Sequence, residues 1–146
     1  GQVAVGERAD LRTVSLEPPD APACTESIEA ILSADQVVLG PGSLYTSVLA
    51  ATAVPGVAEA VRRTSARVVY VCNLHPQVSE TAGYGVADHV DALARHGLIP
   101  EVVLYDPDTI RGADGVVGAR GVRLAAANGL AHDPVLLGVA LAALVA

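Results

Sequence analysis

Short apolar runs alternate with amphipathic segments along most of this chain, and this alternation limits the folds available to it. The apolar, β-branched runs lie at 36–39, 67–72 and 101–105. Helical spacing of apolar residues is found at 25–33, 44–52, 55–63 and 86–96. Strands that read as continuous apolar runs are typical of parallel sheets covered on both faces by helices. We therefore expect a three-layer α/β fold with a mainly parallel sheet, in which Val37–Leu39, Val68–Cys72 and Val102–Leu104 are central strands.

Less regular segments lie at the two ends of this pattern. Leu11–Leu16 alternates like a strand, and Gly121–Leu124 is predicted as the last strand of the sheet. Thr25 is the expected N-cap of the first helix. Asp133, followed by Pro134, predicts the start of a closing helix that runs to about Val145.

Composition narrows the classes of protein to consider. The 146 residues suffice for one domain, and 51% of them are hydrophobic, whereas the formal net charge is -7 and all nine basic residues are Arg. An acidic chain argues against nucleic-acid binding, which needs a basic face. We find no secretory signal, no CxxC pair and no apolar run long enough to enter a membrane, so we expect a cytoplasmic protein.

A glycine-rich loop follows the first apolar run. Gly40, Pro41, Gly42 and Ser43 stand between this predicted strand and a predicted helix that carries Thr46. Ligands of open α/β sheets bind at the carboxyl ends of strands, where glycines let the backbone approach an anion and helix N-terminal N–H groups donate to it. The pattern predicts a phosphate site, and a simple tight turn with Ser43 as the cap is the alternative.

A second polar segment follows the next apolar run and should leave the same edge of the sheet. Its candidate ligand-binding residues are Asn73, Gln77, Glu80, Thr81, Asp88 and His89. Simpler roles are a solvated loop and, for Asp88, a favourable charge at a helix start. The spacing of Glu80, Asp88 and His89 fits no zinc pattern. Asp88 and His89 are neighbours on one predicted helix, so their side chains point in different directions. We expect no metal, no cofactor and no catalytic residue among them.

The segment Ala34–Val48 strongly resembles the signature of YvcK-type proteins, the gluconeogenesis factors, through its Gly-Pro-Gly-Ser-Leu-Tyr-Thr-Ser run. Val54–Val57, Tyr70–Leu74 and the pair His132-Asp133 follow in the order of that family. The resemblance implies a CofD-like, Rossmann-related fold and binding of a UDP-sugar, UDP-N-acetylglucosamine. It also implies a regulatory role that links carbon metabolism to cell-wall synthesis and cell shape, without an established catalytic reaction.

Three departures from the family pattern bear on this expectation. Family members are about twice as long and begin with a glycine-rich turn, so residues 1–146 are expected to be the C-terminal half of the domain. Such a half should self-associate or pair with the missing half. The loop His75–Thr81 keeps only part of the family's Met-Thr-Gln-Pro-Gly-Glu-Thr, and Pro134 stands where some members carry a phosphorylated Thr.

Two other functions stay open. One is a 2-phospho-L-lactate transferase of the CofD type, whose corresponding loop resembles Gly-Pro-Ser-Asn-Pro; Gly42-Ser43-Leu44 favours the gluconeogenesis factors instead. The other is a scaffold half that binds no ligand.

Overall fold

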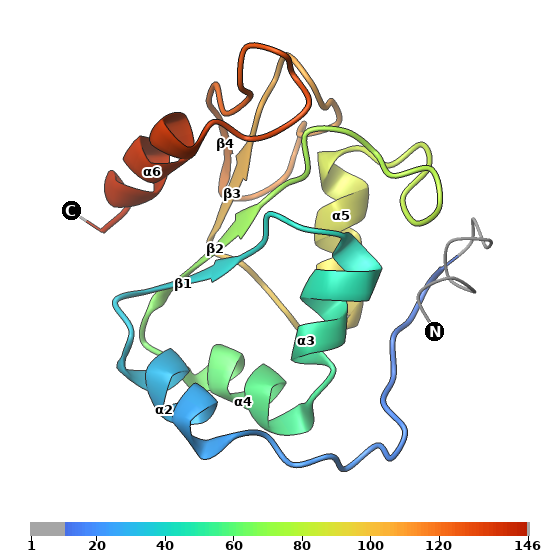
Figure 1. The fold of residues 1–146 in the computed structure, drawn as a ribbon, viewed down its shortest axis with the longest axis vertical. Helices are drawn as coiled ribbons and strands as arrows, with labels where there is room; N and C mark the ends of the chain where they lie inside the picture. Colours follow the sequence, from blue (N-terminus) through green and yellow to red (C-terminus); the bar gives the residue numbers. More distant parts are fainter. Residues whose placement is uncertain (1–10, 146) are drawn as a thin grey trace.

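The computed structural model describes residues 11–145, and a parallel four-stranded sheet lies at its centre (Figure 1). The strands follow one another in chain order: β1 (Gln36–Leu39), β2 (Arg67–Val71), β3 (Val102–Tyr105) and β4 (Ala119–Gly121). All three strand pairs are parallel. The prediction of an α/β fold with a mainly parallel sheet is therefore confirmed.

Helices cover both faces of this sheet (Figure 1). On one side lie α2 (Thr25–Ser33), the wide helical segment η1 (Leu44–Leu49), α3 (Ala50–Thr52), α4 (Pro55–Arg63) and α5 (Val86–Arg95). On the opposite side lies α6 (Pro134–Ala142). Pro at the first position starts both α4 and α6, because its missing N–H needs no partner there.

The alternation of side chains along β2 divides the core into two clusters. Tyr70 and Cys72 pack with η1 and α5, whereas Val69 and Val71 face the opposite side, where Leu137 of α6 packs. The side chains of Val69, Tyr70 and Val71, and of Cys72 directly after β2, are fully buried. This arrangement confirms the three layers expected from the sequence.

One predicted strand is wrong, and the predicted last strand is displaced by two residues at its start. Leu11–Leu16 is extended but joins no strand among residues 11–145; instead the N–H of Val14 donates to Nε2 of His96 at 3.0 Å. The last strand ends at Gly121, before most of the predicted segment 121–124. It ends there because the N–H groups of Leu124 and Ala125 donate to the Asp106 carboxylate, at 2.7 and 2.8 Å, rather than to a strand.

Smaller differences concern the ends of elements. β1 is an edge strand of the described sheet rather than a central one, and Val38 is 38% exposed. Cys24, not Thr25, holds the N-cap position of α2, because Thr25 already has helical backbone geometry. The closing helix ends at Ala142.

In the part of the chain that the structure describes, no single helix is long and apolar enough to cross a membrane. One bent pair of helical segments, Leu44–Thr52 with Pro55–Arg63, reaches the length and hydropathy of a membrane span, by length and composition only.

Candidate functional site

The loops that follow β1 and β2 meet at the carboxyl edge of the sheet, as the sequence predicts. Nε2 of Gln77 donates to Oγ of Ser43 at 2.9 Å, although the two residues lie 34 positions apart. The oxygen of Tyr84 lies 3.0 Å from that of Tyr45, which joins the same two segments a second time. The glycine-rich loop and the second polar segment therefore form one continuous edge.

Gly40 allows the chain to turn sharply at the end of β1. Its φ is +83°, a conformation that side-chain-bearing residues rarely adopt, and a Cβ there would lie 2.9 Å from the carbonyl oxygen of Val71. Beyond this turn, no residue within 11–145 accepts a hydrogen bond from four backbone N–H groups, those of Gly42, Ser43, Leu44 and Thr46. Clustered free N–H groups of this kind are what an oxyanion needs from a backbone.

Glu80 holds the start of η1 from the second loop. Its carboxylate accepts the N–H of Tyr45 at 3.0 Å and the hydroxyl of Thr46. The side chain of Glu80 is only 5% exposed, so this contact lies inside the fold. Thr46 was predicted to donate to a ligand, but its hydrogen is already used on Glu80. Its contact with a ligand stays a prediction, and donation by its hydroxyl would require this bond to break.

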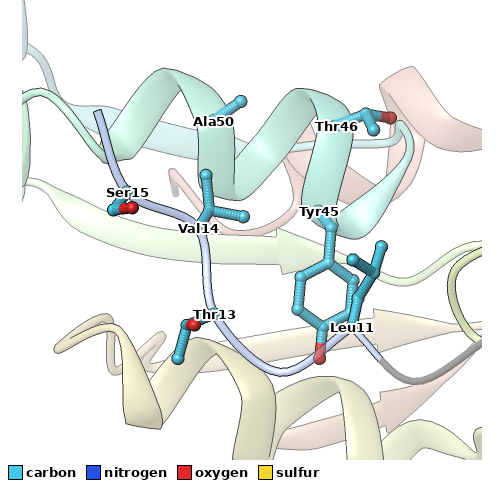
Figure 2. Close-up of a pocket in the computed structure, with 7 residues that line it drawn as sticks. All are labelled: Leu11, Thr13, Val14, Ser15, Tyr45, Thr46 and Ala50. Carbon is cyan, nitrogen blue, oxygen red and sulfur yellow. The ribbon is translucent and has the colours of Figure 1, made fainter. Parts of the chain in front are cut away.

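A cavity of about 480 Å³ lies between the extended segment 11–15 and η1 (Figure 2). Figure 2 shows the Tyr45 ring reaching from the helix toward Leu11, while Thr46 leaves the same turn in a different direction. Burial raises the pKa of Tyr45 to about 12, and the neighbouring Tyr84 hydroxyl adds to this shift. The phenol is therefore neutral at any physiological pH.

The remaining residues of the second loop divide by their exposure. Asn73 is half-buried, and the structure records no hydrogen bond from its side chain to residues 11–145. Thr81 is fully buried, and its Oγ1 accepts the N–H of Gln77 at 2.8 Å. Thr81 thus shapes the turn that presents Gln77 to Ser43, whereas Asn73 stays available to a ligand.

Asp88 and His89 lie in the first turn of α5, and neither has a recorded hydrogen bond to residues 40–43. Asp88 accepts the N–H of Gly85 at 2.8 Å, so it caps the helix start where the sequence analysis expected a favourable charge. His89 is fully buried, with Nδ1 2.9 Å from the carbonyl oxygen of Gly85 and with Tyr84 packed edge-on against its ring. Burial lowers the pKa of His89, so the ring is neutral at pH 7. Ligand contact stays a prediction for both residues.

Two contributors to this edge were missed or left unassigned by sequence reasoning. Asp106 is 1% exposed and accepts three backbone N–H groups, from Asp108, Leu124 and Ala125. Its position directly after β3 was the available signal. His132 lies 3.3 Å from the Cys72 carbonyl oxygen through Nε2, and burial lowers its pKa. Among residues 11–145, no three His, Cys, Asp or Glu side chains gather closely enough to hold a metal ion.

Comparison with known proteins gives this edge a family context. Residues 1–121 match the sequence model of the family described as 2-phospho-L-lactate transferase CofD. A gluconeogenesis factor from Halalkalibacterium halodurans is 40% identical over 114 residues, covering 72% of this chain and 35% of the relative. A Mycobacterium tuberculosis protein whose name also includes gluconeogenesis factor is 48% identical over 107 residues, covering 73% and 31%. The chain thus spans about a third of the length of these relatives.

Solved structures agree with these relatives. A crystal structure of a UPF0052 family member from Bacillus halodurans superposes with a TM-score of 0.84 and 31% identity, covering 99% of this chain and 54% of the other. A second crystal structure from Bacillus halodurans gives a TM-score of 0.70 and 38% identity, covering 77% of this chain and 37% of that one.

Proposed function

This chain belongs to the CofD family and resembles the gluconeogenesis factors, and we propose that it binds a phosphate-bearing, nucleotide-type ligand at the edge formed by Gly40–Ser43 and the loop after β2. The observation that supports this proposal most is that the N–H groups of Gly42, Ser43, Leu44 and Thr46 have no acceptor among residues 11–145. They lie beside Ser43, whose oxygen accepts from Gln77 and whose hydrogen is left to donate. An anion at this point would meet donors from both the backbone and a hydroxyl.

The absence of Lys from the chain does not weaken this proposal. Backbone N–H groups and hydroxyls bind diphosphates in many α/β proteins without a cationic side chain. Glu80 occupies the N–H of Tyr45, so the anion would sit on the Gly42–Leu44 side of the helix start rather than on its axis. This placement also leaves the carboxylate of Glu80 engaged with its own donors.

UDP-N-acetylglucosamine is the ligand that the family resemblance implies, and we take it as the specific proposal. The family resemblance also implies a regulatory role without an established catalytic reaction, and we include that role in the proposal. In this proposal the bound nucleotide sugar would report on carbon supply, and the protein would act in the cytoplasm on cell-wall synthesis and cell shape. No residue of the edge is assigned to bond breaking.

Titration of UDP-N-acetylglucosamine into wild type and Ser43→Ala tests the site. A hydrogen bond to a charged group contributes about 1.5–3 kcal/mol, so affinity should fall about ten- to a hundredfold. Ser33→Ala is the matched control, because that hydroxyl bonds only to Glu29 and Ala30 carbonyls within α2. Equal affinities of wild type and Ser43→Ala, in equally folded proteins, would move the site elsewhere.

A CofD-type phospholactate transferase is the second candidate, because the matching family is described by that activity. The loop sequence Gly42-Ser43-Leu44 argues for the first proposal over this one. Incubation with a deazaflavin precursor and a phospholactate-bearing guanosine nucleotide distinguishes the two. Product formation would favour the transferase, and failure of every nucleotide to bind would favour a scaffold without a ligand.

The apolar outer face of α6 supports a proposal of association with further polypeptide. Val135 and Val139 of α6 are 71% and 66% exposed, Val145 beyond its end is 55% exposed, and Val38 of the edge strand β1 is 38% exposed. This chain covers 54% of the UPF0052 structure. We propose that polypeptide equivalent to the rest of that structure covers this surface. Sedimentation of the chain with and without that polypeptide tests it. Self-association alone would assign the surface to a second copy, and a compact monomer that binds neither would overturn it.

A further inference from the structure

A second cavity, of about 280 Å³, is connected to the glycine-rich loop through Gln77. Gln77 lines this cavity and also donates a hydrogen bond to Ser43 of the loop. The cavity opens between the loop after β2 and the segment that leads to α6. Four polar side chains line it, namely Asn73, His75, Gln77 and His132, together with the apolar Leu74 and Leu130. Its volume lies just below the roughly 300–1,000 Å³ of drug-sized ligand sites, which suits a single ring rather than a whole nucleotide.

The hydrogen bonds of the two imidazoles fix which of their nitrogens carries the proton. Nε2 of His75 lies 2.8 Å from the carbonyl oxygen of Gly129, and Nε2 of His132 lies 3.3 Å from that of Cys72. A carbonyl oxygen only accepts, so Nε2 is the donor in both rings. In a neutral imidazole the other nitrogen, Nδ1, then carries a lone pair and accepts.

Both lone pairs are open to a ligand. Within residues 11–145, the structure records no hydrogen bond to Nδ1 of His75 or of His132. The Asn73 amide, which also lines the cavity, has no recorded partner there either. No Arg, Asp or Glu is among the lining residues. The cavity therefore offers two imidazole acceptors, two amides and no charge, which disfavours a phosphate and favours a ring that donates hydrogen bonds.

We infer that this cavity is the subsite for the sugar ring of the ligand, held through sugar hydroxyls by Nδ1 of His75 and His132. The inference rests on the proposed function, because the sugar would reach the cavity from a diphosphate on Gly42–Leu44, past Gln77. A pyranose presents several hydroxyl donors, whereas a uracil ring presents one N–H, so the two imidazole acceptors among the lining residues match the sugar better.

The test compares the affinities of UDP-N-acetylglucosamine, UDP and inorganic diphosphate for the intact protein, for wild type, His75→Leu and His75→Gln. The Leu variant removes the acceptor, and the Gln variant restores one on a flexible stem. A neutral hydrogen bond contributes about 0.5–1.5 kcal/mol, so His75→Leu should weaken the nucleotide sugar about two- to tenfold and leave UDP unchanged. His75→Gln should recover part of that loss. His132→Gln, at the half-buried ring, should also weaken only the nucleotide sugar.

The outcomes separate the two proposals. Equal binding of UDP and UDP-N-acetylglucosamine to wild type, or equal losses of both ligands in His75→Leu, would overturn the sugar subsite and leave the phosphate site intact. If wild type binds UDP no more tightly than diphosphate, but binds UDP-N-acetylglucosamine much more tightly than UDP, the sugar subsite is strengthened. Wild type that binds none of the three probes would overturn both proposals.

Discussion

The carboxylate of Glu80 accepts the backbone N–H of Tyr45 at 3.0 Å, across 35 residues of sequence. A negative charge at a helix start interacts favourably with the helix dipole, and a buried charged hydrogen bond is stronger than a neutral one. We expect Glu80→Gln to lower the free energy of unfolding by about 1–3 kcal/mol, measured by urea denaturation. The glycine-rich loop should lose order with it, because η1 begins directly after Ser43.

Glu59→Gln is the matched control for this change. Glu59 pairs with Arg62 at 2.7 Å, but both side chains are about half exposed, so the pair contributes at most about 1 kcal/mol. If the two Gln variants lose equal stability, the contact between Glu80 and Tyr45 has no special weight in holding the two loops together.

Asp106 is predicted to be essential for the end of the sheet. Burial alone would raise the pKa of its carboxyl, but the N–H groups of Leu124, Ala125 and Asp108 outweigh burial and lower it. Its stabilising effect is therefore full above the unfolded-state pKa and is lost as the pH falls through the folded-state value. Asp106→Asn, which places an amide against three donors, should cost about 1.5–3 kcal/mol at pH 7.

Urea denaturation at pH 7 measures this cost, and Asp108→Asn is the control, because that side chain is exposed. The control should change stability by no more than about 0.5 kcal/mol. A small loss for Asp106→Asn, matching the control, would show that the segment 122–125 is held by its other contacts.

Gly115 and Gly118 have nearly the same positive φ but differ in the space around the Cβ position, so substituting each tests backbone strain and steric clash separately. Gly118 has φ +75° and a Cβ there would lie 2.1 Å from the carbonyl oxygen of Glu101, whereas Gly115 has φ +76° and no atom within 4 Å of its Cβ position. Gly115→Ala should cost only the left-handed conformation, about 1–2 kcal/mol. Gly118→Ala should cost clearly more, because the N–H of Val103 donates to the Gly118 carbonyl and would be displaced.

Thermal unfolding of the two variants checks this difference. Equal melting temperatures would mean that the 111–118 loop shifts freely, and the close approach to β3 would then contribute little to the sheet.

The sheet and most helices could be predicted because local signals agreed with the final packing. The continuous apolar runs of β2 and β3 are buried on both faces, and Pro55 and Pro134 begin helices as expected. Leu11–Leu16 misled because alternation predicts a strand only where a neighbouring edge is available. In this fold the segment crosses helices instead, and the N–H of Val14 finds an imidazole.

The site could be predicted only in part, for a related reason. The sequence places Ser43 and Gln77 after neighbouring strands, and topology brings them within 2.9 Å. It could not show that Glu80 turns inward to the helix start, or that His89 is buried, because both depend on how a thirteen-residue loop (73–85) folds back. Polar residues in such a loop look alike in sequence, whatever direction they later take.

His89 predicts a loss of stability in mild acid. Burial lowers its pKa, so below about pH 6.5 the unfolded chain binds a proton that the folded chain does not. The free energy of unfolding should therefore decrease as the pH falls from 7 to 5. His89→Asn should flatten this slope, and His132, whose pKa is also lowered, should supply the remainder. An unchanged slope in His89→Asn, from urea denaturation at several pH values, would contradict this assignment.

His96 fastens the extended segment 11–15 to the rest of the fold. Its Nδ1 lies 2.8 Å from the carbonyl oxygen of Ala92 and must donate, so its Nε2 accepts the N–H of Val14. His96→Ala should release the segment and raise the rate of tryptic cleavage after the exposed Arg12 about two- to tenfold, the range that a neutral hydrogen bond supports. Mass spectrometry of the early fragments measures this rate.

His75→Ala, on a loop distant in sequence from this segment, should leave the rate of cleavage after Arg12 unchanged. Equal cleavage in wild type and His96→Ala would mean that the packing of Leu11 and Val14 against the core holds the segment without the imidazole.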